Sequence, residues 1–278
     1  MVPPTRPVKR HHPRVERTFD RHVTSVGVER AGAAARDEVA VEEPLEIRVD
    51  GEPVAVTMRT PGEDEALAAG FLAGEGLIGG PQDVLAAGPP EDLAANVVEV
   101  RTRAGLRRDP RAERSFHLTS SCGVCGKAAL ESVRLEAPPP GRPTPVDRGL
   151  VRRAPDELRR RQSSFERTGG LHATALFDAG GELLAIHEDV GRHNAMDKAI
   201  GELLLAGRHP LPGVLACVSG RSSFELVQKA ALAGLAGIVA VGAPSSLAVA
   251  LAREREMLLC GFARGGSFNV YSGGARLA

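Results

Sequence analysis

From Thr168 to the C-terminus, segments with the pattern of strands alternate with segments that have the pattern of helices. Apolar strand patterns on either side of Ala179-Gly180-Gly181 predict a β-hairpin. After it we expect a helix over 194–205, a strand over 213–219, a helix over 223–234, a strand over 237–242, a helix over 247–257 and strands over 258–263 and 267–271. A hairpin followed by this alternation predicts a mixed sheet with helices on both faces. Right-handed crossovers would make its later strands parallel.

The chain before Thr168 predicts a smaller α+β region. The elements expected there are a hairpin over 38–58 around Asp50-Gly51, a helix over 63–78 that Thr60 caps, and strands over 96–103 and 115–118. The fold class is therefore α/β of a mixed α+β kind, with the larger sheet in the C-terminal half.

Local composition divides the chain into four parts. They are a basic, disordered tail over 1–18, an N-terminal α+β region over 19–137, a Pro-rich linker and charged helix over 138–167, and a C-terminal α/β domain over 168–278. We interpret the charges of that helix as a solvated face.

Charge and aromatic content exclude some partners. Lys plus Arg and Asp plus Glu both number 35, so the net charge favours neither nucleic acid nor a membrane surface. With no Trp and one Tyr, the chain lacks a stacking platform for single strands. The uncharged run 230–252 is long enough to span a bilayer, but its glycines and Pro244 break it. We expect a soluble protein without a secretory signal.

The stretch Ser120 to Lys127 holds two cysteines, Cys122 and Cys125, between glycines. A helical pattern begins directly after it, so the pair is predicted at a helix start. The helix dipole and Lys127 would both favour thiolate there. A thiolate attacks sulfur, binds metal or carries a persulfide, and a sulfur-handling nucleophile fits this pair best.

Three other interpretations of the cysteine pair stay open. A zinc site would need further ligands, whereas Cys217 and Cys260 lie in apolar runs and are expected in the core. A thioredoxin-like redox pair would need a compact βαβ pattern around it. The pair could also be an exposed loop without function. The core positions of the other two cysteines indicate a reducing compartment.

Three further stretches are candidate binding sites. Ser219-Gly220-Arg221-Ser222 follows a buried strand and opens a helix, which is how proteins present N–H groups and an arginine to phosphate. Ser222 and Glu225 would form a capping box, and Pro244-Ser245-Ser246 opens the next helix in the same way. The polar stretch His187 to Asn194, which includes His193, exceeds what capping requires. The third stretch, Phe262 to Asn269, pairs a strand end with Arg264 and two glycines.

Taken in order, these stretches resemble the FdhD family of formate dehydrogenase accessory sulfurtransferases. The resemblance rests on TPGEDEALAAGFLAGEGLI, SSCGVCGK, TGGLHATALF, HEDVGRHNAMDKAIG, VSGRSSFELVQKAALAG, APSSLAVALA and GFARGGSFNVYS, which run from about Pro44 to Ser272. HEDVGRHNAMDK and SGRSSFELVQK are specific enough to make chance similarity improbable.

The resemblance implies a cytoplasmic homodimer whose C-terminal half has a cytidine-deaminase-like fold. It implies sulfur transfer from a cysteine desulfurase to the Mo-bis(molybdopterin guanine dinucleotide) cofactor, a bound substrate, before the cofactor enters formate dehydrogenase. Cys122 would carry the persulfide, with Cys125 as its partner in shuttling or protection. The segment matching the cofactor-binding stretch is Phe262, Ala263, Arg264, Gly265, Gly266 and Ser267; with Asn269, Arg221 and its neighbours it would hold the nucleotides.

Two other classes of function stay possible. One is a chaperone that shields the molybdenum cofactor and transfers nothing. The other is a zinc enzyme that uses Cys122, Cys125 and a histidine. Zinc deaminases place a His-x-Glu before their CxxC, whereas here the CxxC comes first and His187-Glu188-Asp189 lacks that spacing. Zinc deamination is therefore disfavoured, and no permanently bound metal is expected.

Overall fold

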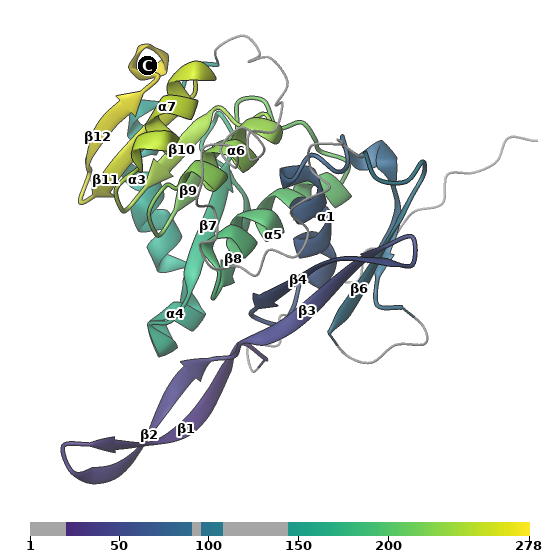
Figure 1. Cartoon of the computed structure of the whole chain (residues 1–278). Helices are drawn as coiled ribbons and strands as arrows, with labels where there is room; N and C mark the ends of the chain where they lie inside the picture. The colour runs from purple at the N-terminus through teal and green to yellow at the C-terminus, as the bar shows by residue number, and fades with distance from the viewer. Residues whose placement is uncertain (1–20, 91–95, 108–143) are drawn as a thin grey trace, which may run out of the picture.

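The computed structural model describes residues 21–90, 96–107 and 144–278. Its strands form three sheets (Figure 1). The two-stranded sheet contains β1 (Val23–Arg30) and β2 (Ala33–Ala40), and the four-stranded sheet contains β3 (Glu43–Val49), β4 (Glu52–Arg59), β5 (Val84–Gly88) and β6 (Val97–Thr102). The six-stranded sheet contains β7 (His172–Phe177), β8 (Leu183–Asp189), β9 (Leu215–Val218), β10 (Gly237–Ala240), β11 (Leu258–Arg264) and β12 (Ser267–Ser272).

The six-stranded sheet confirms the predicted mixed α/β fold. Its strand order is β12-β11-β10-β9-β7-β8. β10 runs parallel to β9 and β11, whereas β7 is antiparallel to both β8 and β9, and β12 is antiparallel to β11. Every residue of β9 and β10 is buried, as expected for strands that are covered on both faces. The predicted hairpin and the parallel later strands are both present.

Helices cover both faces of this sheet. α5 (Arg192–Leu205), α6 (Phe224–Leu232) and α7 (Ser246–Glu254) pack on one face, where Met196, Val227 and Leu251 join the core. α3 (Arg148–Arg160) packs on the other face against Cys217 and Cys260. The prediction that these two cysteines lie in the core is confirmed. Burial raises the pKa of Cys260 to about 12, so its thiol stays protonated and unreactive.

The charged segment before β7 forms two helices, α3 and α4 (Ser163–Thr168). The Asp147 carboxylate caps α3 by accepting hydrogen bonds from the N–H groups of Gly149 and Leu150, at 2.8 and 2.9 Å. The arginines of α3 are exposed, as predicted. The helix also buries a stripe against the sheet, made of Leu150, Val151, Ala154, Pro155 and Leu158. The charged helix is therefore amphipathic and shares the core of the C-terminal sheet.

The four-stranded sheet has the order β4-β3-β6-β5. Its β3–β4 hairpin turns at Asp50-Gly51, as predicted, and β6 confirms the strand expected over 96–103. α1 (Asp64–Gly74) packs on one face, where Leu67 and Leu72 meet Ile47 and Val98. Two short 3₁₀ turns, η2 (Pro81–Asp83) and η3 (Gly274–Arg276), complete the elements of the described chain.

The predicted start of α1 is wrong. The helix begins at Asp64, and Glu63 occupies the N-cap position with φ 52 and without a side-chain capping bond. Thr60 makes tertiary contacts in place of a cap. Its backbone N–H donates to Asp189 Oδ2 at 3.1 Å, and its hydroxyl accepts from the Val190 N–H at 3.2 Å. Thr60 thus ties the N-terminal region to the end of β8.

Two glycines bring the backbones of α1 and α5 into contact. A Cβ atom on Gly70 would lie 1.8 Å from the carbonyl oxygen of Asp197, and one on Gly201 would lie 1.8 Å from that of Ala66. Small residues at a helix crossing allow such an approach. Leu204 of α5 also belongs to the core of the four-stranded sheet. The crossing therefore joins the two larger sheets into one packed body.

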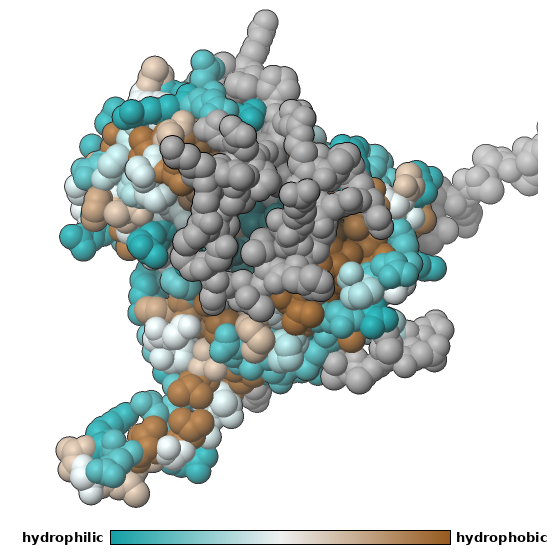
Figure 2. Space-filling model, in the orientation of Figure 1, coloured by the Kyte–Doolittle hydropathy of each residue, from teal (hydrophilic) through white to brown (hydrophobic). Residues whose placement is uncertain are grey.

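The β1–β2 hairpin projects from the body as an arm (Figure 1). At its base, Arg167 Nε on α4 donates to Glu38 Oε2 at 3.0 Å. The arm surface in Figure 2 carries both hydrophobic and hydrophilic residues. The hairpin predicted over 38–58 was too long, because residues 38–40 belong to β2 of this arm.

Among the described helices, none combines the length and the apolar character that crossing a bilayer would take.

Candidate functional site

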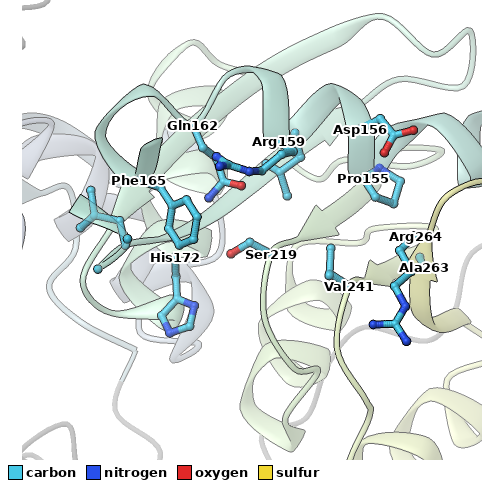
Figure 3. A pocket seen from close by; sticks show the side chains of 14 residues that line it. Pro155, Asp156, Arg159, Gln162, Phe165, His172, Ser219, Val241, Ala263 and Arg264 are labelled. Atoms are coloured by element: carbon cyan, nitrogen blue, oxygen red, sulfur yellow. The ribbon is translucent and has the colours of Figure 1, made fainter. Parts of the chain in front are cut away.

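A cavity of about 500 Å³ lies where the carboxyl ends of β9, β10 and β11 meet the start of β7 (Figure 3). The strand ends contribute His172, Ser219, Val241, Ala263 and Arg264. The opposite wall comes from α3, α4 and the segment before β7, and it consists of Pro155, Asp156, Leu158, Arg159, Gln162, Phe165, Gly169, Gly170 and Leu171. The carboxyl edge of parallel strands is where open α/β sheets bind ligands.

The cavity has an apolar body and a few polar groups, as small-molecule sites do. Arg159 and Arg264 supply positive charge, and Asp156 supplies one negative charge. Burial lowers the pKa of His172, and the nearby Arg192 and His193 lower it further. His172 is therefore neutral at pH 7 and offers one donor and one acceptor. This composition suits a ligand with a flat apolar part and an anionic part.

Three of the predicted binding residues line the cavity: Ser219, Ala263 and Arg264. Ser219 is held in place because its Oγ accepts a hydrogen bond from the Ala173 N–H at 2.8 Å. Gly220 lies just behind the wall, since a Cβ atom on it would come within 3.2 Å of His172 Nδ1. A side chain at this position would push against the histidine.

The remaining residues of the FARGGS segment lie outside the cavity wall. Gly265 and Gly266 form the turn between β11 and β12, with φ of 56 and 74 that suit glycine. Ser267 and Asn269 follow on β12. Phe262 is 43% exposed and has φ 52, which is unusual for a bulky residue and marks the bulge in β11. Its N–H donates to the Gly242 carbonyl at 3.0 Å.

The predicted pairing of two helix starts is present, but on the other face of the sheet. The Ser245 N–H donates to the Ser222 carbonyl at 3.0 Å, so the starts of α6 and α7 lie side by side. Ser245 caps α7 by accepting from the Ala248 N–H. No residue of either first turn lines the cavity described above. Arg221, in the loop before α6, is exposed and likewise does not line it.

The predicted capping box of Ser222 and Glu225 is not formed. α6 begins at Phe224, with Ser223 as its N-cap. The Ser222 hydroxyl is buried without a hydrogen-bond partner among the described residues, and Glu225 lies against His193, whose Nε2 is 3.8 Å from Glu225 Oε2. The register of the helix start is one residue later than predicted, and this turns Ser222 inward.

His193 joins the starts of α5 and α6. Its Nε2 lies 3.3 Å from Ser223 Oγ as well as near Glu225. It lines no part of the cavity. These contacts hold the start of α5 against the start of α6.

The titration of Glu225 tests this contact. The nearby His193 ring lowers the pKa of Glu225 to about 2. A carboxyl whose folded pKa is depressed stabilises the fold above its ordinary value of 4.5, and that contribution is lost as the pH falls from 4.5 towards 2. We expect His193→Gln to raise the Glu225 pKa towards the ordinary value, measured by carbon-detected NMR titration. An unchanged Glu225 titration in that variant would show that the contact is absent.

The rest of the polar stretch before α5 makes structural contacts. His187 Nε2 lies 2.6 Å from Glu202 Oε2, and Asp189 Oδ2 forms a fully buried ion pair with Lys198 Nζ at 2.9 Å. Asn194 Nδ2 donates to Asp189 Oδ1 at 3.0 Å. Lys198 also donates to the Thr60 carbonyl at 2.8 Å. These groups connect α5 to β8 and to the chain before α1.

Asp197 on α5 has a comparable role. Its Oδ1 lies 3.0 Å from Lys229 Nζ on α6, and the same ammonium lies 2.9 Å from Glu75 Oε1. Burial raises the pKa of Asp197 to about 6, although the Lys229 charge acts in the opposite direction. Asp197 braces three segments against one another and does not face the cavity.

Cys122 and Cys125 lie outside the described residues, and so does the strand predicted over 115–118. Within the described residues, no group of three or more His, Cys, Asp or Glu side chains could hold a metal ion.

Sequence reasoning missed the wall formed by Arg159, Gln162, Phe165 and His172. The sequence predicts that Arg159, Gln162 and Phe165 lie in one solvated, charged helix. In the structure, α3 ends at Arg160 and the chain then turns over the edge of the sheet. His172 lay in a quoted motif but was not selected. A signal was present in Gly169-Gly170, because two glycines directly before a buried strand indicate a close approach of backbone to another group.

Comparison with known proteins identifies related chains. A model of the FdhD/NarQ family matches residues 40–278. The sulfur carrier protein FdhD of Streptomyces avermitilis is 52% identical over 255 residues, which cover 87% of this chain and 89% of that protein. The protein of the same name from Mycobacterium tuberculosis is 48% identical over 251 residues, covering 86% of this chain and 91% of that one.

Comparison with solved structures identifies a chain of the same fold. It comes from the crystal structure of a putative formate dehydrogenase accessory protein from Desulfotalea psychrophila, with a TM-score of 0.72. The match covers 92% of this chain and 98% of that one, at 24% sequence identity. At that identity the likeness bears on the fold alone.

Proposed function

The chain belongs to the FdhD/NarQ family, and from this premise we propose that it is a sulfur carrier in the maturation of a formate dehydrogenase. The observation that carries the proposal is that curated relatives about half identical over most of the chain are named sulfur carrier proteins. The solved neighbour is named for an accessory role towards formate dehydrogenase. The single CxxC of the sequence supplies the thiols that such a role requires.

In the proposed reaction, the Cys122 thiolate attacks the outer sulfur of a cysteine persulfide on a cysteine desulfurase. A new S–S bond forms at Cys122 Sγ, the S–S bond on the desulfurase breaks, and the desulfurase cysteine leaves as a thiolate. Cys122 then carries the persulfide to the molybdenum of Mo-bis(molybdopterin guanine dinucleotide). Release of the outer sulfur as sulfide takes two electrons, which a thiol supplies by attacking Cys122 Sγ. That thiol is either Cys125 or an external dithiol.

The cavity at the carboxyl edge of the sheet supports the cofactor part of the proposal. Its volume of about 500 Å³ is in the range of small-molecule sites. In the proposed complex, Arg264 would face the phosphates of one nucleotide arm, because guanidinium groups bind phosphate through paired hydrogen bonds. The cofactor is a substrate here, which the chain holds only while sulfur is transferred. A cytoplasmic homodimer with formate dehydrogenase as its client belongs to the same proposal.

A cofactor-binding chaperone is the second candidate. The observation that favours it is that the described residues of the cavity wall lie between Pro155 and Arg264, a part of the sequence that does not contain the CxxC. Such a protein would bind the nucleotide without any need for a thiol.

Binding of GDP, a fragment of the proposed cofactor, tests the role of Arg264. We expect Arg264→Gln to weaken GDP binding about tenfold or more, because a charge-assisted contact with phosphate is lost. The measurement is isothermal titration calorimetry at fixed salt concentration. Arg208→Gln is a matched control, since Arg208 is exposed and does not line the cavity. Equal losses in both variants would mean that Arg264 contributes only general charge.

Reconstitution tests the sulfur transfer itself. A desulfurase and radiolabelled cysteine are incubated with the protein and with Mo-bis(molybdopterin guanine dinucleotide), and the label on the isolated cofactor is counted. We expect labelled cofactor only when the protein is present. Equal labelling without the protein would show that the desulfurase delivers sulfur directly.

A further inference from the structure

Gln162 is a buried amide on the cavity wall. Gln162 is only 4% exposed, and it lines the cavity together with Phe165. Its side chain makes no hydrogen bond with any residue that the structure describes, and it does not cap the helix that follows. A primary amide carries two N–H donors and a carbonyl acceptor. Neither amide atom is among the fully enclosed polar atoms that lack a partner, so both are open to the cavity, where a ligand can satisfy them.

A residue from another element caps the start of α4. Gln162 stands at the N-cap position of α4, where a side chain usually accepts from the first free N–H groups. Here the Glu188 carboxylate accepts from the Ser164 N–H at 3.0 Å and from the Phe165 N–H at 2.8 Å. Glu188 thus satisfies the start of α4 from β8. The carboxamide of Gln162 is left available to the cavity.

The surroundings of Gln162 suit a flat, aromatic ligand. The Arg159 guanidinium carbon lies 4.7 Å from the centre of the Phe165 ring. Figure 3 shows Gln162, Arg159 and Phe165 on one wall, with Ser219 across from them. Aromatic rings and guanidinium planes are surfaces on which nucleobases stack. Arg264 on the strand side provides a place for an anionic group attached to such a base.

We infer that Gln162 determines the base specificity of this cavity, by forming paired hydrogen bonds with the edge of a nucleobase. On the proposed function, on which this inference rests, the base is guanine. Gln162 Oε1 would then accept from the guanine N1–H, and Nε2 would donate to O6. Paired contacts of an amide side chain with a base edge are an established means of base recognition.

The test compares GDP with its N1-methyl derivative, which cannot donate from N1 and carries a methyl group where Gln162 would approach. In the wild type we expect GDP to bind about tenfold to a hundredfold more tightly than the methylated form, the range for one paired base contact. In Gln162→Ala the side chain is gone, so the two ligands should bind with nearly equal affinity. Both affinities are measured by calorimetry on the full chain.

Two controls separate recognition from folding. Gln82→Ala changes an exposed glutamine outside the cavity and should keep the wild-type preference for GDP. Pyrophosphate should bind the wild type and Gln162→Ala equally, because it lacks a base. A purely structural role for Gln162 would weaken all three ligands alike and leave the ratio of the two GDP forms unchanged, which would overturn the inference.

Failure of this inference is distinguishable from failure of the proposed function. Sulfur uptake by Cys122 is measured without nucleotide and does not depend on Gln162. A wild type that takes up sulfur but binds GDP and N1-methyl-GDP equally would overturn the role of Gln162 alone. A wild type that binds no GDP at all would overturn it as well.

Discussion

Replacing Cys122 with alanine is expected to reduce the client formate dehydrogenase to the activity of cells that lack the protein. The proposed carrier holds its sulfur on this one atom, and alanine cannot form a persulfide. The measurement is formate oxidation in extracts of cells that express each variant in place of the wild type. Ser121→Ala changes the neighbouring hydroxyl and should leave activity at the wild-type level.

The same variant separates the carrier from the chaperone. Cys122→Ala should still bind GDP, because the cavity residues lie elsewhere in the chain. Full client activity with Cys122→Ala would contradict the carrier role and favour the chaperone. Cys125→Ala is run beside it. Loss of activity with Cys125→Ala would assign the reducing attack to Cys125, and retained activity would assign it to an external dithiol.

Gly201→Ala is expected to lower the free energy of unfolding by about 3 kcal/mol or more, the upper part of the range for overpacked cores. The added Cβ would lie 1.8 Å from the Ala66 carbonyl oxygen, which belongs to a helix backbone and cannot rotate away. α1 and α5 would have to separate, which would disturb the contact that joins the two larger sheets. Urea unfolding followed by circular dichroism measures the loss.

Gly88→Ala is the matched control for this prediction. Gly88 lies in β5, and a Cβ atom added there would meet no heavy atom within 4 Å. Its free energy of unfolding should stay within about 0.5 kcal/mol of the wild-type value. If Gly201→Ala were as stable as Gly88→Ala, the close crossing of α1 and α5 would be wrong.

Much of the fold follows from local patterns. β9 and β10 are short apolar runs between helices, and this pattern fixes them as buried strands of a mixed sheet. The β3–β4 hairpin follows from alternation around Asp50-Gly51. Such features depend on residues close in sequence, so the chain itself indicates them without knowledge of tertiary contacts.

Two of the predictions that proved wrong concern helix caps, and in each case a contact with a residue distant in sequence replaces the cap. Thr60 has the spacing of a cap, but Asp189 and Val190, about 130 positions away, take its hydrogen-bonding groups. Ser222 and Glu225 have the spacing of a capping box, but Glu225 lies against His193 and α6 begins one residue later. In both cases a local preference is overridden by a tertiary contact, which spacing alone cannot indicate.

The polar motif before α5 shows that sequence alone also fails to separate structural residues from binding residues. Its density of charged residues indicates a functional role, yet Asp189 and Lys198 form a buried ion pair that fastens α5 to β8. A buried pair and a ligand-binding pair look alike in a sequence, because both need opposite charges at a strand end. Ser219 was predicted from a loop that opens a helix and Arg264 from a strand end with two glycines, and both residues line the cavity at the carboxyl edge of the sheet.

The intact mass of the protein after incubation with a cysteine desulfurase and free cysteine, without reductant, tests the central claim most directly. Wild type, Cys122→Ala and Cys125→Ala are run side by side. We predict an adduct of about 32 Da per sulfur atom on the wild type and none on Cys122→Ala. The same adduct on Cys122→Ala, or no adduct on the wild type, would contradict a persulfide carried by Cys122.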